Sequence, residues 1–411
     1  MKYFVESYGC TMNYGEGDQL SKKMRSLGHS PVASADEADI VVLNTCTVVD
    51  TTEKRMIKRM NDLRAQGKEV IVTGCMAKVQ GNRISIRLPD SMIIPPDEYD
   101  LFTGKVESKY GCGSCTDSFE YGNTAIIPIA QGCLGRCAYC ITKFARGKLI
   151  SRTEDDILNE FKDLLDSGVK EFLLTAVDTA CYGKDIGTNL PSLLRKVLEF
   201  EGDYRLRIGM MNPNHLDTIL DDMIEIFNDD RVYKFIHIPV QSGSNSVLSD
   251  MRRPYTVERF MGIVNRLRES VPQISIATDM ICGFPGESDK DHQKSITLIR
   301  NLRADTVNIT RYSPRPGTEA LTLPNQVHGN VSKDRSAELT EVKNRTELDV
   351  NSELIGKTFN VLVTEIGKDG TVIARTDNYR PVGIKGNFNI GDFLEVEITD
   401  CASTYLIGTL K

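Results

Sequence analysis

Hydrophobic residues recur in two different patterns along the first hundred residues of the chain. The apolar runs "YFVESYG", "DIVVLNT" and "EVIVTG" have the length of buried strands, and amphipathic helical stretches around 16–27 and 51–66 alternate with them. Short strands that alternate with helices are typical of a parallel sheet. We therefore expect an N-terminal parallel α/β sheet domain over residues 1–110.

The same alternation resumes after a loose, glycine-containing segment, 104–123. Strand-like runs occur at "TAIIPIA", "EFLLTA", "RLRIGM", "KFIHIPV", "ISIATDMI" and "TVNITRY", with helices such as 153–167 and 256–270 between them. About six βα units suit a partial barrel better than a closed eight-stranded one. We assign this barrel to residues 124–345, so the predicted fold class is α/β.

A helical stretch around 332–349 leads into a region with a different pattern, residues 350–411. Its short alternating runs are "TFNVLVTEIG", "GTVIART", "DFLEVEIT" and "STYLIGTL", and glycines separate them. This pattern predicts a small antiparallel β-barrel. Such barrels often bind RNA, but from Asn351 onward six Lys and Arg stand against eight Asp and Glu, so a purely structural cap is an alternative.

The composition and the start of the sequence suit a protein of a reducing compartment. The 411 residues are 40% hydrophobic and 26% charged, as in ordinary globular proteins. The start "MKYFVESYGC" lacks the pattern of a secretory signal, and no apolar run has membrane-spanning length. We expect a cytoplasmic protein without membrane contact, whose eleven cysteines include metal or redox ligands and do not form a disulfide framework.

Three cysteines occupy equivalent positions in the N-terminal domain. Cys10, Cys46 and Cys75 each come directly after a predicted strand. In an open parallel sheet, the carboxyl ends of the strands line the ligand-binding crevice. A cysteine that merely fills space as a small hydrophobic residue would explain one such position, but three equivalent positions favour a converging thiolate site.

A second group of three cysteines follows the first strand of the predicted barrel. The sequence "CLGRCAYC" contains Cys133, Cys137 and Cys140, and no histidine or fourth cysteine lies nearby. Structural zinc takes four protein ligands, and catalytic zinc usually recruits histidine or a carboxylate. Three thiolates can instead hold a cluster of four irons and leave the fourth iron open to another ligand. The loop therefore predicts a chemically active iron–sulfur cluster.

Positive charge is concentrated around this loop, although the whole chain has a formal charge of −7. Residues 125–153 contain no Asp or Glu. A local basic face of this kind can bind nucleic acid, whereas a solvated surface loop is the alternative. A second basic patch in the first domain is more typical of a solvated helix face. The first group contains Arg136, Lys143, Arg146, Lys148 and Arg152, and the second contains Lys54, Arg55, Lys58 and Arg59.

The C-x3-C-x-aromatic-C pattern of Cys133, Cys137 and Cys140, with Tyr139 before the last cysteine, resembles the signature of radical SAM enzymes. With the preceding trio and the small terminal β-barrel, the whole chain resembles the methylthiotransferases, whose terminal barrel is a TRAM domain. The stretches "GCLGRCAYCITKFARG", "CYGKDIGTNLPSLL", "FIHIPVQSGSNSVLSDMRR", "ATDMICGFPGE" and "YSPRPGT" are similar to the archaeal and eukaryotic tRNA branch. That branch modifies N6-threonylcarbamoyladenosine at position 37, next to the anticodon.

The resemblance implies two 4Fe–4S clusters and S-adenosylmethionine (SAM) as cofactors. The cluster on Cys133, Cys137 and Cys140 would bind SAM and cleave it to a 5′-deoxyadenosyl radical, which takes hydrogen from C2 of the adenine. The auxiliary cluster on Cys10, Cys46 and Cys75 would carry the sulfur that a second SAM methylates. The partners would be the anticodon stem-loop of tRNA and a reductase or a ferredoxin-type electron donor.

Further site residues follow from the same resemblance. Asp178 would contact the SAM amino group, although Val177 and Cys181 beside it depart from the family pattern. Gln241 and Ser242 would contact the ribose and carboxylate, and Gly283 the adenine, with strand-end caps as the alternative for the polar three. The candidate cofactor-binding residues are thus Tyr139, Asp178, Gln241, Ser242 and Gly283, and the candidate RNA contacts are Lys143, Arg146, Lys148 and Arg152.

Several alternatives stay open. A methylthiotransferase that acts on N6-isopentenyladenosine or on a ribosomal-protein aspartate would share all six cysteines. An RNA-binding module with structural metal sites would have closed metal sites and would not cleave SAM. Cys112 and Cys115 in "GCGSC" lie outside both trios; they could form a redox couple or half of a metal site, and in a glycine-rich linker the absence of any function is the preferred interpretation.

Overall fold

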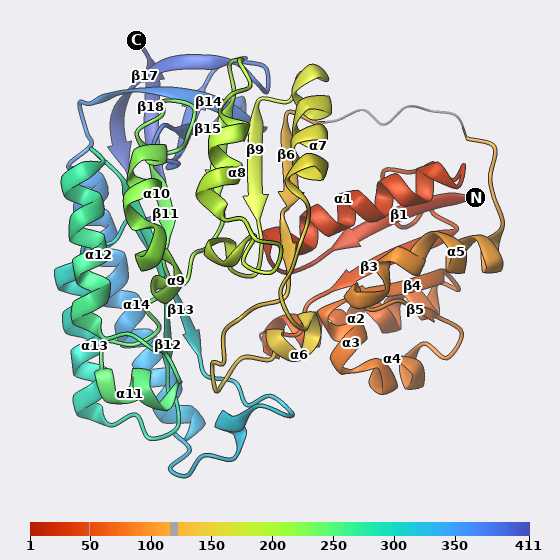
Figure 1. Cartoon of the computed structure of the whole chain (residues 1–411), viewed down its shortest axis with the longest axis horizontal. Helices are drawn as coiled ribbons and strands as arrows, with labels where there is room; N and C mark the ends of the chain where they lie inside the picture. Colours follow the sequence, from red (N-terminus) through yellow and green to blue (C-terminus); the bar gives the residue numbers. More distant parts are fainter. Residues whose placement is uncertain (49, 116–121) are drawn as a thin grey trace.

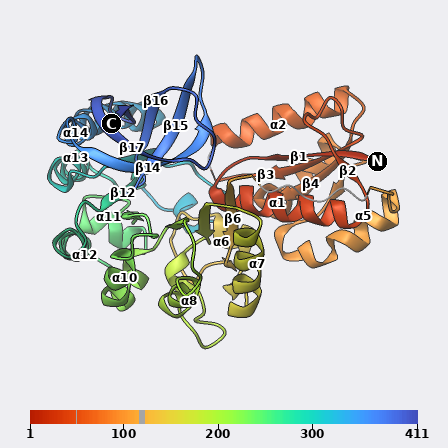
Figure 2. The same ribbon diagram turned by 90° about the horizontal axis from the view of Figure 1, so that it is seen from above.

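Three domains follow one another along the chain in the computed structural model, which describes residues 1–48, 50–115 and 122–411 (Figure 1). The C-terminal β-barrel lies on one side of the central strands and helices, and the N-terminal sheet lies beside both (Figure 2). No helix of the described residues has the length and hydrophobicity needed to cross a membrane.

The N-terminal domain is a five-stranded parallel sheet in the order β2-β1-β3-β4-β5. Alternate residues of β3 are buried on opposite faces, since Ile40 and Val42 pack with α1 and α5 while Val41 and Leu43 pack with α2, α3 and α4. The elements are β1 (Lys2–Ser7), α1 (Thr11–Ser26), β2 (Ser30–Pro31), β3 (Ile40–Thr45), α2 (Asp50–Ala65), β4 (Glu69–Gly74), α3 (Cys75–Val79), α4 (Gly81–Arg87), β5 (Met92–Ile93) and α5 (Phe102–Tyr110).

Helix α5 corrects the expectation of a loose segment over 104–123. Phe102 and Val106 lie four residues apart on one face of this helix, and both are fully buried against the sheet. Two buried side chains at this spacing stabilise a helix that the polar composition of the segment did not indicate. Cys112 and Cys115 follow the helix in an irregular stretch, and residues 116–121 lie outside the described residues.

Six parallel strands with their helices form the partial barrel that the sequence predicted. They are arranged as two three-stranded sheets, β6-β9-β10 and β11-β12-β13, and a parallel bridge between Leu206 and Val232 lies between them. The six strands are β6 (Thr124–Pro128), β9 (Glu171–Thr175), β10 (Arg205–Ile208), β11 (Phe235–His237), β12 (Ser275–Cys282) and β13 (Thr306–Arg311). A separate antiparallel pair, β7 (Ala130–Gln131) and β8 (Ile150–Ser151), follows β6.

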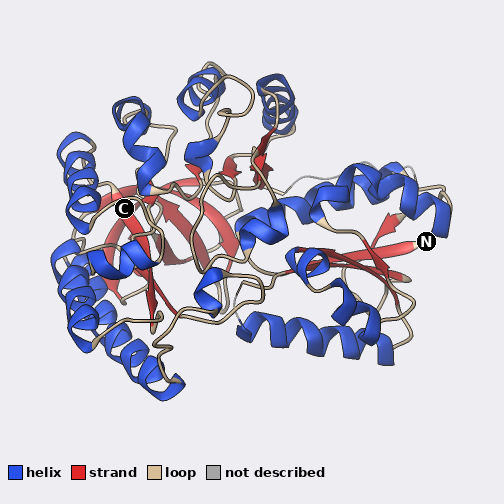
Figure 3. Ribbon diagram, turned by 60° about the horizontal axis from the view of Figure 1, so that its bottom comes forward, coloured by secondary structure: helices blue, strands red, loops and turns tan. Residues whose placement is uncertain are grey.

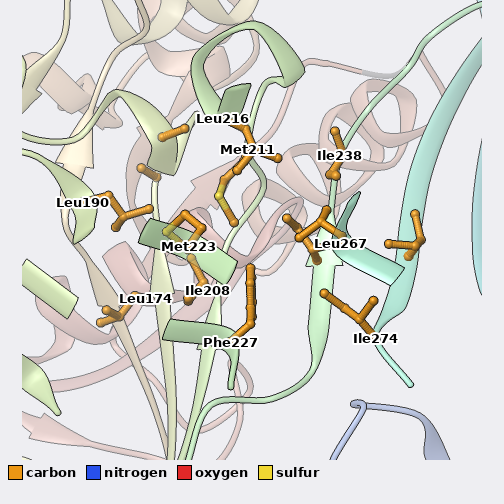
Figure 4. Packing of buried hydrophobic residues seen from close by; sticks show 14 of the residues in the cluster. Leu174, Leu190, Ile208, Met211, Leu216, Met223, Phe227, Ile238, Leu267 and Ile274 are labelled. Carbon is orange, nitrogen blue, oxygen red and sulfur yellow. The ribbon is translucent and has the colours of Figure 1, made fainter. Parts of the chain in front are cut away.

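Helices cover the outside of these strands as an open arc (Figure 3). Leu174 and Ile208 from the strands pack against Leu190, Met223 and Phe227 from two of the helices (Figure 4). Burial of each such side chain contributes about 1.5–3 kcal/mol. The helices are α6 (Thr142–Arg146), α7 (Glu154–Asp166), α8 (Leu190–Val197), α9 (Pro213–Leu216), α10 (Leu220–Phe227), α11 (Asn245–Asp250), α12 (Val257–Ser270), α13 (Asp289–Leu302) and α14 (Gly329–Ser352).

The C-terminal domain is a closed barrel in the order β14-β15-β16-β18-β17. Its strands are antiparallel except for the β16–β18 pair, which is parallel, so the expected wholly antiparallel barrel needs this correction. The sequence patterns missed β16, because its first residue is Pro381 and Gly383 interrupts its apolar pattern. The strands are β14 (Thr358–Ile366), β15 (Thr371–Thr376), β16 (Pro381–Lys385), β17 (Phe393–Cys401) and β18 (Leu406–Leu410).

Polar contacts hold the outer domains against the half-barrel. Arg380 at the start of β16 forms a buried ion pair with Asp305, which precedes β13. On the other side, Lys22 of α1 forms an ion pair with Glu160 of α7 at 3.0 Å. The first contact joins the C-terminal barrel to the half-barrel, and the second joins the N-terminal domain to it.

Candidate functional site

Cys10, Cys46 and Cys75 lie at the carboxyl ends of β1, β3 and β4, which are neighbours in the sheet. The backbone around them is tightly packed. Gly9 has φ +113°, and a Cβ atom at this position would lie 2.7 Å from Cβ of Cys46. A larger residue here would push two of the three cysteines apart, so the glycine lets the chains approach closely.

A buried arginine from the barrel domain reaches into this trio. Nε of Arg146 lies 3.2 Å from Sγ of Cys75, and its Nη2 donates to Oδ1 of Asn13 at 2.6 Å. The same guanidinium forms a buried ion pair with Glu16. Burial raises the pKa of the Cys75 thiol to about 12, against the lowering effect of Arg146. At neutral pH this thiol stays protonated until a metal supplies further positive charge.

The second trio lies in the loop between β7 and α6. The backbone N–H of Gly135 donates to Sγ of Cys133 at 3.2 Å, and Nη1 of Arg253 donates to Sγ of Cys137 at 3.3 Å. Burial raises the pKa of Cys133 to about 11 and also raises that of Cys140. The first trio therefore contains two buried thiols, the thiols of the second trio are half-buried, and an arginine lies at one sulfur of each trio. Such donors are typical of the surroundings of iron–sulfur clusters.

The spacing of the thiols distinguishes a cluster from a single metal ion. A zinc–sulfur bond is about 2.3 Å long, so two sulfurs on one ion lie less than about 4.6 Å apart. In the described parts of the chain, only Asp178, Cys181 and His215 have their ligand atoms all within 4.8 Å of one another. Neither trio meets this condition, although each converges on one space. The thiols thus fit a larger cluster better than zinc.

Both trios face the same cavity. Its volume is about 930 Å³, and all six cysteines line it, together with residues from the N-terminal sheet, the half-barrel and the C-terminal barrel. The two groups of thiols come from different domains. Arg146 connects them, because it lies on α6, directly after the loop of the second trio, and contacts Cys75 of the first trio. The fold therefore brings two three-thiol sites to one reaction space.

Asp178 lines the cavity but is already bonded within the protein. Its Oδ2 lies 2.7 Å from Nδ1 of His215 and 3.2 Å from Sγ of Cys181, and its Oδ1 accepts the backbone N–H of Asn212. Its side chain is fully buried. The separations within this triad are hydrogen-bond distances. A contact with the SAM amino group stays a prediction, and it would have to share a carboxylate with these partners.

The structure places the two residues after β11 differently. Gln241 lines the cavity, has φ +74°, and its buried Oε1 has no hydrogen-bond partner in the described structure. A strained backbone and an orphaned polar atom are typical of a ligand contact. In the described structure Ser242 does not line the cavity, and its Oγ accepts the backbone N–H of Ser244. Of the two, Gln241 fits a bound cofactor.

Gly283 also has a neighbour that the sequence did not indicate. Its φ is +73°, and a Cβ atom there would lie 2.5 Å from Oγ of Ser332 on α14. In the described structure Gly283 does not line the cavity. Tyr139 does line the cavity, and its ring meets Phe284 edge to face with centroids 6.4 Å apart. The glycine is thus required for helix packing.

We expect Gly283→Ala to lower the stability of the fold by about 1–3 kcal/mol, because the residue would adopt a left-handed backbone and press on Ser332. The midpoint of thermal unfolding measures this effect. Adding Ser332→Gly should restore the part due to the clash. A variant of unchanged stability with a higher KM for SAM would instead support the adenine contact.

The candidate RNA contacts separate into two groups. Lys143 and Lys148 are exposed beside the cysteine loop. Arg146 is buried against Glu16, so the expectation that it binds phosphate is wrong; its position at the last turn of α6 points it inward. Arg152 is half-buried and forms an ion pair with Glu160 at 2.7 Å. In the second basic patch, Arg59 likewise forms an ion pair with Glu6.

Sequence patterns did not indicate that Arg146 and Arg253 contact cysteine sulfurs or that Asn13 bonds to Arg146. Arg253 stands next to Arg252, which is exposed and pairs with Glu319, and nothing in "MRRP" distinguishes the buried arginine from the exposed one. The absence of acidic residues from 125–153 was a usable signal for Arg146, because its partner Glu16 lies in another domain. Long-range pairs of this kind are invisible to local patterns.

Comparisons with known proteins agree with this geometry. Three family models match: uncharacterized protein family UPF0004 over residues 2–94, the radical SAM superfamily over 127–299 and the TRAM domain over 353–411. The radical S-adenosylmethionine methyltransferase TsrM from Kitasatospora setae, solved with cobalamin and a [4Fe-4S] cluster, has a similar fold. Its TM-score is 0.59 at 14% identity, over 78% of this chain and 76% of that chain.

Several named relatives are similar to this chain over its whole length. A probable threonylcarbamoyladenosine tRNA methylthiotransferase from Archaeoglobus fulgidus is 40% identical over 100% of this chain and 99% of its own length. The corresponding protein from Pyrococcus abyssi is 42% identical over 99% of both chains. The human threonylcarbamoyladenosine tRNA methylthiotransferase is 34% identical over 99% of this chain and 73% of its own length. The chain therefore belongs to the threonylcarbamoyladenosine tRNA methylthiotransferase family of radical SAM proteins.

Proposed function

We propose that this chain transfers a methylthio group to C2 of N6-threonylcarbamoyladenosine at position 37 of tRNA, by radical SAM chemistry. The observation that carries the proposal is the pair of three-thiol sites on one cavity. A single radical SAM site can abstract hydrogen, but adding sulfur requires a second site that supplies it. The names of the relatives give the substrate.

Two 4Fe–4S clusters and SAM are the cofactors. Cys133, Cys137 and Cys140 would hold one cluster, and Cys10, Cys46 and Cys75 the other. When bound, the first cluster would supply the electron that cleaves SAM to methionine and a 5′-deoxyadenosyl radical, and the second would hold the sulfur to be transferred. A reductase or a ferredoxin-type protein is the proposed electron donor, in a cytosol that keeps the thiols reduced.

The protein's own side chains would prepare both sites. Arg253 and Arg146 place positive charge at Cys137 and Cys75, which favours the thiolate forms. Gln241 offers a free, buried amide oxygen to a donor on SAM, and the ring of Tyr139 covers the cavity wall beside the second trio. A bound RNA would have to close the open side of the cavity to keep water away from a radical that would otherwise react unselectively.

The surface next to this cavity suits the anticodon stem-loop. Lys143 and Lys148 are exposed, and between them Phe144 is 50% exposed. Lysines can neutralise backbone phosphates, and an exposed ring can stack on an unpaired base. The base at position 37 would have to turn out of the loop to place C2 in the cavity.

An anaerobic assay with digested nucleosides read by mass spectrometry tests the function. Reconstituted protein with dithionite, SAM, sulfide and tRNA bearing threonylcarbamoyladenosine should form the 2-methylthio nucleoside. Cleavage of SAM without this product would mean that the radical chemistry is right and the substrate wrong. Absence of SAM cleavage from fully loaded, reduced protein would refute the enzymatic assignment.

A further inference from the structure

The end of the cavity away from the cysteine loop contains an arginine without a counterion. Arg207 is on β10, between Leu206 and Ile208, whose side chains are buried in the core between strands and helices. Because side chains alternate along a strand, Arg207 points to the opposite face, and it lines the cavity inside the half-barrel. It pairs in register with Leu173, two residues before β9 ends, or roughly 7 Å below the carboxyl edge at about 3.3 Å per residue.

No acidic side chain neutralises this guanidinium. Within the described residues Arg207 takes part in no ion pair and no hydrogen bond, and its Nε is buried without a partner. Two of the acidic groups that line the cavity are engaged elsewhere: Asp279 bonds to His237 at 3.0 Å, and Glu347 lies 3.6 Å from Lys343. A half-buried cation without a partner is costly in a folded protein, so it indicates a missing anion.

Two aromatic rings hold the arginine in place. Its Cζ lies 5.0 Å from the ring centroid of Phe235 and 4.8 Å from that of Tyr379. Tyr379 comes from the turn between β15 and β16 of the C-terminal barrel and has φ +64°, a strained conformation for a bulky residue. Arg375 also lies against this ring, at 4.9 Å. Rings that flank a guanidinium fix its plane and leave its N–H edge for a planar anion.

A carboxylate is the planar anion that an arginine fork binds best. Both substrates of the proposed reaction contain one, since SAM has a methionine carboxylate and the threonylcarbamoyl group has that of threonine. The SAM carboxylate belongs at the cysteine loop, where Arg253 already lies at Cys137. On adenine, C2 and the carbon that bears N6 are both bonded to N1, so the C2–H bond and the N6 substituent leave the ring in different directions. With C2 toward the thiols, the N6 substituent therefore points to a different part of the cavity wall, and Arg207 lies on that wall.

We propose that Arg207, held between Phe235 and Tyr379, binds the carboxylate of the threonylcarbamoyl group and thereby selects this nucleoside. The inference rests on the proposed function and names the residue that reads its substrate. When an adenosine with an uncharged N6 substituent fills the cavity, the Arg207 guanidinium would be shut off from water and would have no anionic partner. Such a site discriminates through the unpaired charge that the wrong substrate leaves behind.

Two synthetic anticodon stem-loop RNAs test this assignment. They differ only at the threonyl group, which is a free carboxylate in one and its N-methylamide in the other. The reconstituted full chain should prefer the carboxylate RNA by at least about 10-fold in kcat/KM, as expected for charge-assisted hydrogen bonds. Arg207→Gln should remove this preference by lowering kcat/KM on the carboxylate RNA alone, and Arg207→Lys should retain part of it.

Arg205→Gln is the matched control, because this arginine lies two residues earlier on β10, bonds to Asp377 at 3.4 Å and is not among the residues that line the cavity in the described structure. It should keep the wild-type preference.

Equal use of both RNAs by the wild type, or an equal loss on both RNAs in Arg207→Gln, would overturn the inference. A raised KM for SAM, or slower 5′-deoxyadenosine formation without RNA, would assign Arg207 to the SAM carboxylate. A wild type that modifies neither RNA would refute the proposed function itself.

Discussion

Replacing Cys137 by alanine is expected to abolish SAM cleavage, whereas replacing Cys10 by alanine should leave SAM cleavage intact and remove only the methylthio product. The two thiols line one cavity but belong to separate trios on separate domains. Loss of one ligand removes the chemistry of that cluster, and we expect a drop of more than about 1,000-fold in the affected step. The readouts are 5′-deoxyadenosine and the modified nucleoside from the same reaction.

Iron content provides a readout that does not depend on activity. Each variant should bind about half of the wild-type iron, because one cluster is lost and the other kept. Cys282→Ala is a suitable control, since Cys282 is buried on β12 outside the cavity wall of described residues. It should retain full iron and both products. If Cys10→Ala also stopped SAM cleavage while keeping half of the iron, the division of roles between the trios would be wrong.

The fold was largely predictable because its signals are local. Strand-length apolar runs and helical periodicity identified the parallel sheet and the six strands of the half-barrel, and the cysteines after β1, β3 and β4 could be placed from the rule that ligands lie at carboxyl ends. The misses came from elements with weak local signals. Strand β16 begins with proline, and α5 depends on only two buried residues, Phe102 and Val106.

The side-chain environment of the site was less predictable, for a physical reason. Whether a charged residue is exposed depends on partners that are distant in the sequence, such as Glu16 for Arg146. A basic stretch therefore predicts positive charge, but it does not say which charges point inward. The same holds for Arg207, whose flanking rings come from β11 and from the C-terminal barrel.

The inward charge of Arg146 has a large expected effect on stability. Burial alone would lower the pKa of Arg146, but Cys75 and Glu16 outweigh it, and the net shift is well upward. Arg146→Met would leave the Glu16 carboxylate buried without its counterion. Breaking a buried ion pair in this way costs about 3–5 kcal/mol. We expect a clearly lower unfolding midpoint and faster proteolysis at the contact between the first two domains.

A double variant separates the ion pair from the packing around it. Glu16→Leu together with Arg146→Met replaces both charges with apolar side chains and should recover most of the lost stability, because no buried charge then lacks a partner.

The double variant should still differ from the wild type at the auxiliary site. Without positive charge 3.2 Å from Sγ of Cys75, the reduced and more negative state of a cluster there is less stabilised. In a redox titration followed by electron paramagnetic resonance, the auxiliary signal should therefore appear at a lower potential and the barrel signal should not move. A double variant as unstable as Arg146→Met, or an unchanged auxiliary potential, would mean that Arg146 acts through packing and not through its charge.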